Sequence, residues 1–393
     1  MSLDQTLADR WLGDLGITSG RRVNEVQVVF QHVLYEPSGF GTAAREIAFA
    51  MEDLGVDVKL EVMGGGRSNH LSASTLRRLE RMQQKPLNND RLLLALHPVG
   101  SPGTYRKVIS CTMFETSKAP PSYVSICNQC DAVIVPSEMN RQLFRDGGVT
   151  VPIYVAHYGV DSRLFTPEGP ARELGRSTGQ FVFLSIFGWS DRKGPDILIQ
   201  AFLREFNATD PVRLVLKTHG GNIAQLPSEW YERIARQIDN PSPPDVQIIA
   251  DDLSPEEVAM LYRGSDCFVL PSRGEAIGLP YLESMASGLP VIATGWGGHI
   301  TFLGPQSGYL LPYRLVPAHP VWYTDLYQPD QLWAEADVGA LQNVMRRVYL
   351  QRDEAKRKGQ HGRQVAEGWN WRRTGVEFVQ AIEAIVGQSI RQK

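Results

Sequence analysis

Short apolar runs alternate with polar or helix-patterned segments along most of this 393-residue chain. In the first half the apolar runs are VQVVFQHVL, VDVKLEVM, RLLLALH, KVISCTMF, DAVIVP and VPIYVAHYG, and in the second half they are FVFLSIF, VRLVLKT, DVQIIA, CFVLP and VIAT. Continuous apolar runs of this length between helical patterns are typical of parallel strands that are buried on both faces. The pattern therefore predicts an α/β fold with two parallel arrays, and the chain is long enough for two separate cores.

The composition changes between the two arrays. The segment GVDSRLFTPEGPARELGRSTG is rich in Gly, Pro and charge, so we place the domain linker there, with a first domain over residues 1–165 and a second over 166–370. A final helix is expected within residues 371–393, and an amphipathic segment over 1–22 is expected to be peripheral. Residues 312–334 are rich in Pro and aromatics without periodicity, which predicts a long ordered insertion or a mobile flap.

The most informative stretch lies between the runs CFVLP and VIAT, where one short helix is expected. Pro280 fits its first turn and Gly288 falls just past its end. Glu275 precedes the helix and Glu283 lies about one turn into it, so both carboxylates can face a ligand beyond the carboxyl end of the strand. The backbone N–H groups before the helix belong to Ala276, Ile277 and Gly278. A carboxylate can accept hydrogen bonds from the vicinal hydroxyls of a sugar or ribose, and the N–H groups can donate to a polar ligand. The alternative is a capped helix with solvated acids.

Two adjacent cations follow the first apolar run of the second array. Arg192 and Lys193 stand in the polar turn of FVFLSIFGWSDRKG, where they could neutralise a diphosphate. The alternative for both is a solvated turn.

A glycine loop follows the first apolar run of the chain. Gly39 and Gly41 lead into a helical pattern, which is the layout of a phosphate cradle. Read as a dinucleotide fingerprint, Gly39-x-Gly41-x-x-Ala44 would take Glu61 as its ribose acid. The match is weak because residues 35–38 separate the strand from the first glycine, whereas that fingerprint needs a tight turn.

Two further polar residues follow apolar runs of the first half, His97 after RLLLAL and Glu115 after KVISCTMF. Both are candidates for a group in the cleft. For His97 the alternative is a core histidine whose hydrogen bonds are satisfied.

The stretch EAIGLPYLESMASGLPVIAT, with Glu275 and Glu283 eight positions apart, resembles the donor site of the retaining nucleotide-sugar glycosyltransferases of family four. The resemblance extends from the Gly39 loop to the Trp371 helix. It implies the GT-B architecture, in which two Rossmann-like domains face each other across a cleft and the C-terminal helix crosses back to the first domain. It also implies transfer of a hexosyl group from a nucleotide sugar, with retention of anomeric configuration.

The resemblance assigns roles to the candidate residues. The catalytic set is Glu115, His97, Lys193 and Glu275. The donor-binding set is Gly39, Gly41, Arg192, Lys193, Glu275, Ala276, Ile277, Gly278, Leu279, Glu283, Gly297 and Gly298. Within this set Glu283 would hold the ribose, Glu275 the hexose, and the cations and glycines the diphosphate, while residues 249–253 would lodge the base.

The chain departs from the family pattern at three places. Glu115 stands where the family usually has a catalytic histidine. Trp189 follows Gly188 where an arginine is usual, so Arg192 is its inferred substitute. Thr301 lies near the position of an acid that usually follows the paired glycines. Because the chain has no Asp-x-Asp motif, we expect neither a metal nor a cofactor beyond the nucleotide sugar as co-substrate.

Composition limits the partners and the compartment. A net charge of −3 provides no global basic field, so we expect no nucleic-acid partner. Four cysteines and the absence of a long apolar run favour a cytoplasmic protein, and the pair Cys127-x-x-Cys130 has no second pair at metal-ligand spacing. Basic residues outnumber acidic ones over 67–107, which fits either a solvated face or a contact with the inner face of an anionic membrane.

The acceptor is left open as a glycan, a lipid-linked or a small-molecule compound. Three other functions remain as alternatives: a sugar-nucleotide epimerase on the same architecture, a dinucleotide oxidoreductase that rests on the Gly39 loop, and a sugar-binding module without catalysis.

Overall fold

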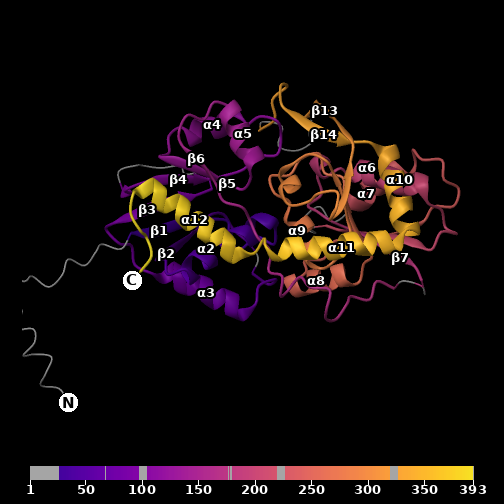
Figure 1. Ribbon diagram of the computed structural model, residues 1–393, viewed down its shortest axis with the longest axis horizontal. Coiled ribbons are helices and arrows are strands. Elements are labelled where there is room, and N and C mark those ends of the chain that lie inside the picture. Colours follow the sequence, from indigo (N-terminus) through magenta and orange to yellow (C-terminus); the bar gives the residue numbers. More distant parts are fainter. Residues whose placement is uncertain are drawn as a thin grey trace, which may run out of the picture.

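The computed structural model describes residues 26–66, 68–96, 104–175, 177, 179–218, 226–318 and 326–392. The amphipathic segment over 1–22 and the candidate His97 lie outside the described residues. Two lobes lie side by side along the long axis of the molecule (Figure 1).

The first lobe is built on a parallel sheet of six strands in the order β2-β1-β3-β4-β5-β6. The strands are β1 (Gln27–His32), β2 (Val58–Val62), β3 (Arg91–Ala95), β4 (Val108–Cys111), β5 (Ala132–Val135) and β6 (Ile153–Val155). Its helices are α2 (Gly39–Asp53), α3 (Ala73–Gln84), α4 (Pro121–Cys127) and α5 (Glu138–Asp146). The pattern did not predict α4, because Pro120-Pro121 reads as a turn; in the structure Pro121 occupies the first helical position, which tolerates proline.

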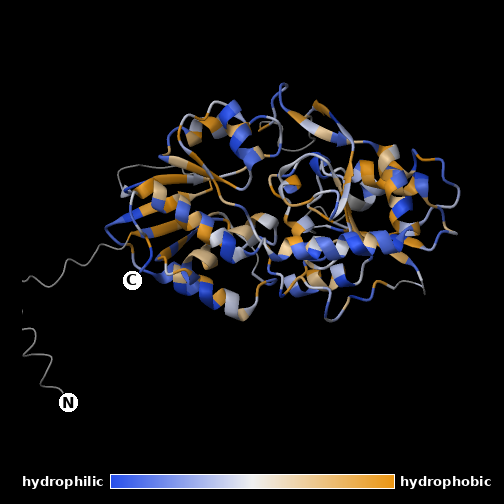
Figure 2. Cartoon of the chain, in the orientation of Figure 1, coloured by the Kyte–Doolittle hydropathy of each residue, from blue (hydrophilic) through white to orange (hydrophobic). Residues whose placement is uncertain are grey.

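The second lobe repeats this plan with the strand order β12-β11-β10-β7-β8-β9, again all parallel. Its strands are β7 (Phe181–Ile186), β8 (Val212–Lys217), β9 (Asp245–Ile249), β10 (Cys267–Leu270), β11 (Val291–Thr294) and β12 (Gly308–Leu311). The helices around it are α6 (Pro195–Glu205), α7 (Leu226–Ala235), α8 (Pro255–Arg263), α9 (Leu279–Ala286), α10 (Val338–Leu350) and α11 (Arg352–Glu367), with short 3₁₀ turns η2 (Asp191–Lys193) and η4 (Gly298–Thr301). Hydrophobic strands lie inside and more polar helices outside in both lobes, which confirms the predicted fold class (Figure 2).

Part of the segment over 312–334 forms regular structure that its sequence did not predict. Strands β13 (Tyr313–Pro317) and β14 (Leu332–Ala336) pair as an antiparallel hairpin beyond the sheet. Strands of five residues within a segment rich in Pro and aromatics have too few positions to show the apolar–polar alternation that predicts a strand. The same segment was expected as an ordered insertion or a flap, and its described parts are ordered strands.

The last helix returns to the first lobe. Helix α12 (Trp371–Val386) begins after a break at Asn370, whose side chain caps it by accepting from the N–H of Arg373 at 3.0 Å. It crosses α2 so closely that a Cβ added to Gly375 would lie 2.8 Å from Cβ of Ala50. Figure 1 shows α11 along the second lobe and α12 along the first. The predicted crossing is thereby confirmed, while the exact domain boundaries stay predictions.

Candidate active site

The order of the second sheet locates its ligand crevice. Strands β7 and β10 are neighbours, and the chain leaves them toward opposite edges of the sheet. In open α/β sheets ligands bind beyond the carboxyl ends of two such strands. The loops that follow these strands carry Arg192 and Lys193 after β7 and Glu275 after β10. The loops are in contact, since a Cβ on Gly194 would lie 2.3 Å from the carbonyl oxygen of Pro271.

The two cations and Glu275 form a buried group of ion pairs. Nζ of Lys193 lies 2.5 Å from Oε1 of Glu275, and Nη1 of Arg192 lies 3.6 Å from Oε2. Glu275 is 5% exposed. Burial raises the pKa of Glu275, but the charges of Lys193 and Arg192 outweigh burial and lower it. The carboxylate is therefore ionised and serves as the counterion of both cations.

Glu115 of the first lobe completes this group. Its Oε1 lies 3.3 Å from Nη2 of Arg192. The loops that carry Glu115 and Glu275 touch at Gly274, where an added Cβ would lie 1.9 Å from the carbonyl oxygen of Glu115. The structure thus brings together Glu115, Arg192, Lys193 and Glu275, which we call the charge cluster.

The loop after Glu275 ends at the N-terminus of α9. The N-cap residue is Gly278, in the left-handed conformation with φ 77°. Because glycine has no side chain, the helix begins without a side-chain cap. Its first-turn N–H groups are therefore free of the usual capping side chain, and the helix dipole favours an anion there. Gly297 and Gly298, the glycine pair, support this loop. The N–H of Gly298 donates to the carbonyl of Glu275 at 2.7 Å, and an added Cβ on Gly298 would lie 1.8 Å from the carbonyl oxygen of Ala276. The hydroxyl of Ser137, from the first lobe, donates to the carbonyl of Ala276 at 2.9 Å.

The glycines of the first lobe lie opposite the N-terminus of α9. An added Cβ on Gly39 would come within 3.8 Å of Cδ1 of Leu279. Both glycines lie in the first turn of α2, not in a loop before it, and Ser38 caps that helix by accepting from the N–H of Gly41. Because six residues separate the end of β1 from α2, the tight turn of a dinucleotide fingerprint is not formed.

Glu283 is separate from the charge cluster. On α9 it accepts from the hydroxyl of Tyr262 at 2.9 Å. Burial raises the pKa of Glu283 to about 7, against the opposing effect of this hydrogen bond. The two carboxylates eight positions apart therefore differ in charge at neutral pH: Glu275 is ionised, and Glu283 is partly protonated.

Sequence reasoning missed Arg273. Its guanidinium makes two bonds to the Asp196 carboxylate, at 2.9 and 2.7 Å, and thereby ties the loop before Glu275 to α6. The signal was present, since a cation two positions before a candidate acid is uncommon in an apolar stretch. The buried His299 was also missed; its Nε2 lies 2.8 Å from the carbonyl of Thr294, behind the glycine pair.

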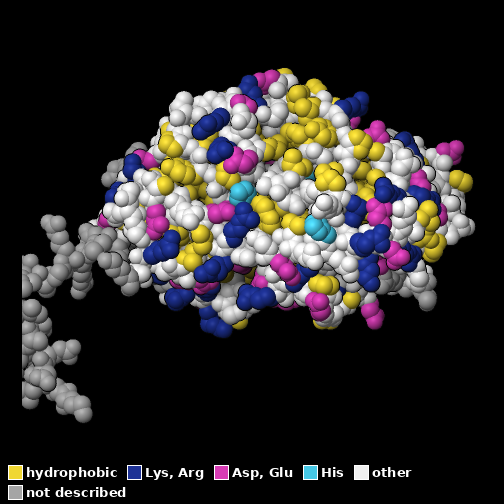
Figure 3. Space-filling model, viewed as in Figure 1, with side chains coloured by type: hydrophobic (Ala, Val, Ile, Leu, Met, Phe, Trp, Pro, Cys, Tyr) yellow, Lys and Arg dark blue, Asp and Glu magenta, His cyan; other side chains and the backbone are white. Residues whose placement is uncertain are grey.

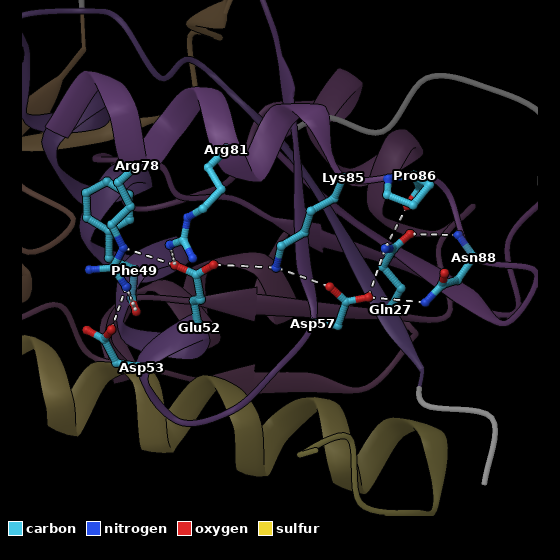
Figure 4. A network of polar contacts seen from close by, with 10 residues as sticks. All are labelled: Gln27, Phe49, Glu52, Asp53, Asp57, Arg78, Arg81, Lys85, Pro86 and Asn88. Carbon is cyan, nitrogen blue, oxygen red and sulfur yellow. Dashed lines mark hydrogen bonds and ion pairs between the residues drawn. The ribbon is translucent and has the colours of Figure 1, made fainter. Parts of the chain in front are cut away.

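Two features outside the site bear on partners. Figure 4 shows that Arg78, Arg81 and Lys85 of the basic segment pair with Glu52, Asp53 and Asp57. Figure 3 shows acidic and basic side chains interspersed over the visible face. The basic excess over 67–107 is thus largely a set of ion pairs within the protein.

The structure also bears on the cysteine pair, on metal ligands and on membrane-spanning helices. All four cysteines are free and buried, and burial raises the pKa of Cys127 to about 12, so it is a poor metal ligand or redox thiol. Within the described ranges, no group of three or more His, Cys, Asp or Glu is arranged to hold a metal ion. Of the helices that the structure describes, none is both long and apolar enough to span a membrane.

Comparison with known proteins assigns the second lobe. Residues 178–318 match the family model described as Glycosyl transferases group 1. The chain is 32% identical over 173 residues to alpha-monoglucosyldiacylglycerol synthase of Streptococcus pneumoniae, covering 42% of this chain and 37% of that protein. It is 31% identical over 202 residues to D-inositol 3-phosphate glycosyltransferase of Acidothermus cellulolyticus, covering 49% and 44%. The matched regions therefore span less than half of these relatives.

Solved structures match nearly the whole chain. Sucrose-phosphate synthase from Thermosynechococcus elongatus has a TM-score of 0.66 at 17% identity, covering 92% of this chain and 99% of that one. HepE of Anabaena in complex with UDP-glucose has a TM-score of 0.65 at 14% identity, covering 91% and 99%. At such identities the likeness shows the fold alone. Residues 178–318 thus match the glycosyl transferases group 1 model, and they lie within a chain that has the GT-B fold.

Proposed function

We propose that this protein transfers a hexosyl group from a nucleotide-diphosphate sugar to an acceptor, with retention of configuration and without a metal ion. The observation that carries the proposal is the pair of buried cations, Arg192 and Lys193, beyond the carboxyl end of β7. Their charges are matched by the carboxylates of Glu115 and Glu275, and Arg192 also donates to the carbonyl of Gly274 at 2.6 Å. Both cations lie on the loop facing the one that leads to α9. This is the arrangement that a departing diphosphate needs.

The chemistry follows from the charges. The bond between the anomeric carbon and a diphosphate oxygen breaks, the acceptor oxygen bonds to that carbon, and the acceptor proton leaves with a base or with the diphosphate. Arg192, Lys193 and the N-terminus of α9 would stabilise the charge that develops on the diphosphate. Once the diphosphate pairs with Lys193, the Glu275 carboxylate becomes available to accept hydrogen bonds from hexose hydroxyls. Glu283 would accept from the ribose hydroxyls.

The comparisons support a nucleotide-sugar donor. HepE of Anabaena was solved with UDP-glucose and with UDP and glucose. The names of two relatives point to a diacylglycerol-linked sugar and to inositol 3-phosphate. For this chain we propose an acceptor that is a glycan, a lipid-linked or a small-molecule compound, and action in the cytoplasm, at the membrane surface if the acceptor is a lipid.

A screen and a product analysis test this function. Nucleotide sugars are first screened by thermal shift, because a ligand at 100 times its dissociation constant stabilises the protein by about 2.7 kcal/mol. The donor that binds is then incubated with candidate acceptors. We expect free nucleoside diphosphate and, by NMR, a glycoside with the anomeric configuration of the donor. An isomerised nucleotide sugar without diphosphate release would instead identify an epimerase.

Metal independence is tested separately. Turnover should persist after exhaustive treatment with EDTA, because fixed cations and a helix dipole carry the charge. Loss of turnover that Mg²⁺ restores would overturn this part of the proposal.

A further inference from the structure

The hairpin of the second lobe reaches the first lobe beside the charge cluster. Residues 326–331, which lead into β14, lie against residues 114–118. Leu326 and Tyr327 pack with the apolar cluster of the first lobe that contains Phe114. A segment of the second lobe thus completes part of the core of the first.

Hydrogen bonds fix this contact in register. The N–H of Ser117 donates to the carbonyl of Leu332 at 2.8 Å, and the N–H of Leu332 donates to Oγ of Ser117 at 2.9 Å. Gln331 is fully buried and donates from Nε2 to the carbonyl of Lys118 at 3.1 Å. Lys118 and Asp330 add an ion pair at the surface. Reciprocal bonds of ordinary length leave little freedom for the two segments to slide.

The same strand also holds the loop that carries Glu275. Two residues after Leu332, the N–H of Ala334 donates to the carbonyl of Arg273 at 2.9 Å. The guanidinium of Arg273 lies 5.6 Å from the ring centroid of Trp333, within the range of a cation–π contact. The edge of β14 that faces away from β13 is therefore bonded at Leu332 to the loop of Glu115 and at Ala334 to the loop of Glu275.

Tyr327 lies where these two loops meet. Its ring centroid is 5.5 Å from that of Phe114, the residue before Glu115, and 6.0 Å from that of Trp333. Burial and then the charge of Glu115 raise the pKa of Tyr327 to about 12, while Arg192 opposes them. The phenol therefore remains protonated at neutral pH.

We propose that β14 and residues 326–331 act as an interdomain clamp that sets the spacing between the loops of Glu115 and Glu275, with Tyr327 as a positioning residue. The inference rests on the proposed transfer reaction, because the clamp acts on residues assigned to it. A broken clamp leaves Arg192, Lys193 and Glu283 on the second lobe, so nucleotide binding persists. It removes Glu115 from the cluster, so transfer is impaired.

The first experiment measures the distance between lobes without any ligand. Spin labels are placed at Glu80→Cys on α3 and Arg204→Cys on α6, both exposed, while the four native cysteines are buried. We expect Tyr327→Ala to broaden the distance distribution toward longer values and Tyr327→Phe, which keeps the ring, to restore it. Leu315→Ala, on the same hairpin but 47% exposed, is the matched control and should leave it unchanged. A distribution like wild type in folded Tyr327→Ala overturns the proposal.

A second variant keeps the test decisive if Tyr327→Ala does not fold. Lys118→Glu places two like charges on the exposed pair and should broaden the distribution, and the double swap Lys118→Glu with Asp330→Lys should narrow it again. Absence of broadening in Lys118→Glu would then overturn the clamp.

Measurements of kcat and of nucleotide affinity distinguish a positioning role of Tyr327 from a purely structural one. We expect Tyr327→Ala to lower kcat by about tenfold or more, because small misplacements of catalytic groups are costly. Its affinity for the nucleoside diphosphate should stay unchanged, and Tyr327→Phe should recover kcat. Equal loss of affinity and kcat would contradict a positioning role. If wild type turns over no nucleotide sugar, the proposed function fails, whereas the distance measurement still decides the clamp.

Discussion

Lys193 and Glu275 neutralise each other, and Arg192 is shared between Glu275 and Glu115. Donor binding on this view exchanges counterions: the diphosphate replaces carboxylates that already satisfy the cations. A buried charge whose partner is removed is costly, so this exchange keeps the cations paired in both states. The cations are thereby held in place before the donor arrives.

The first prediction concerns Lys193. Lys193→Ala should lower kcat/KM by about ten- to a thousandfold, since a charge-assisted bond is worth about 1.5–3 kcal/mol and this one acts where charge develops. Steady-state rates of the folded variant measure the effect. Lys356→Ala, exposed on α11, is the control, and wild-type rates in folded Lys193→Ala would refute the assigned role.

The second prediction concerns the protonation of Glu283. Its pKa is raised to about 7, above the ordinary value of 4.5, so the ionised form that accepts from ribose is populated only as pH rises through that value. The dissociation constant of the nucleoside diphosphate should therefore fall by about tenfold between pH 6 and pH 8, with uptake of diphosphate releasing a proton.

Calorimetry in buffers of different ionisation enthalpy measures both effects. Glu283→Gln should weaken binding and remove the dependence on this proton. Glu275→Gln should not weaken nucleotide affinity but should depress transfer, because Glu275 is assigned to the hexose and competes with the diphosphate for Lys193. Equal loss of nucleotide affinity in both folded variants would contradict the division of roles. The same raised pKa lowers stability as pH rises from 4.5 to 7, because the unfolded chain gives up this proton first.

At the scale of elements, the site depends on loops that approach each other at backbone distance. Gly274 meets the carbonyl of Glu115, and Gly298 meets that of Ala276, at separations that no Cβ can share. Glycine is needed at Gly274 and Gly298 for close approach and not for an unusual φ, since neither residue has a positive φ. The lobes can therefore touch where the charge cluster forms.

Gly274→Ala should push the loop of Glu115 away from the loop of Glu275. We expect transfer to fall by about a hundredfold, the cost of misplacing a catalytic group by about 1 Å. Gly304→Ala is the matched control, because nothing lies within 4 Å of its added Cβ. A folded Gly274→Ala variant with normal kcat would show that the contact is not required.

The elements themselves were largely readable from the pattern. Buried runs such as CFVLP and VIAT became parallel strands, and Pro280 and Gly288 bounded α9, because period and helix-end chemistry are local properties. The hairpin β13–β14 and the pairing of Arg273 with Asp196 were missed, because both depend on contacts between distant segments. The roles of the candidate site residues stay predictions, although geometry places Glu115, Arg192, Lys193 and Glu275 together.

At the scale of the whole molecule, α12 is bonded to the strand end of the first lobe through Glu377. This carboxylate accepts from the backbone N–H of His157 at 2.7 Å and from Nε of Arg373 at 2.8 Å. Burial raises the pKa of Glu377, but the hydrogen bonds from His157 and Arg373 outweigh burial and lower it to about 2. Its stabilisation is therefore present above the ordinary pKa of 4.5 and is lost as pH falls toward 2.

Glu377→Gln should lower the free energy of unfolding by about 1–3 kcal/mol at pH 7. The difference from wild type should shrink as pH is lowered from 5 to 3. Over that range the carboxylate of the unfolded chain, with its ordinary pKa of 4.5, takes up a proton, while the native carboxylate, with a pKa of about 2, stays ionised. Urea unfolding at several pH values measures this. Glu367→Gln, at an exposed ion pair, serves as control, and a difference that does not change with pH would contradict the role of the charge.

The crossing of α12 has a consequence for how the chain is made. The first lobe leaves the ribosome early, yet the surface of α2 around Ala50 packs against a helix that begins at Trp371. At about 5–20 residues per second, on the order of ten to forty seconds pass between synthesis of residue 165 and that of residue 386. Throughout that interval the face of α2 that packs against α12 lacks its partner helix. The need of the first lobe for protection by chaperones should therefore end only when the second lobe is already complete.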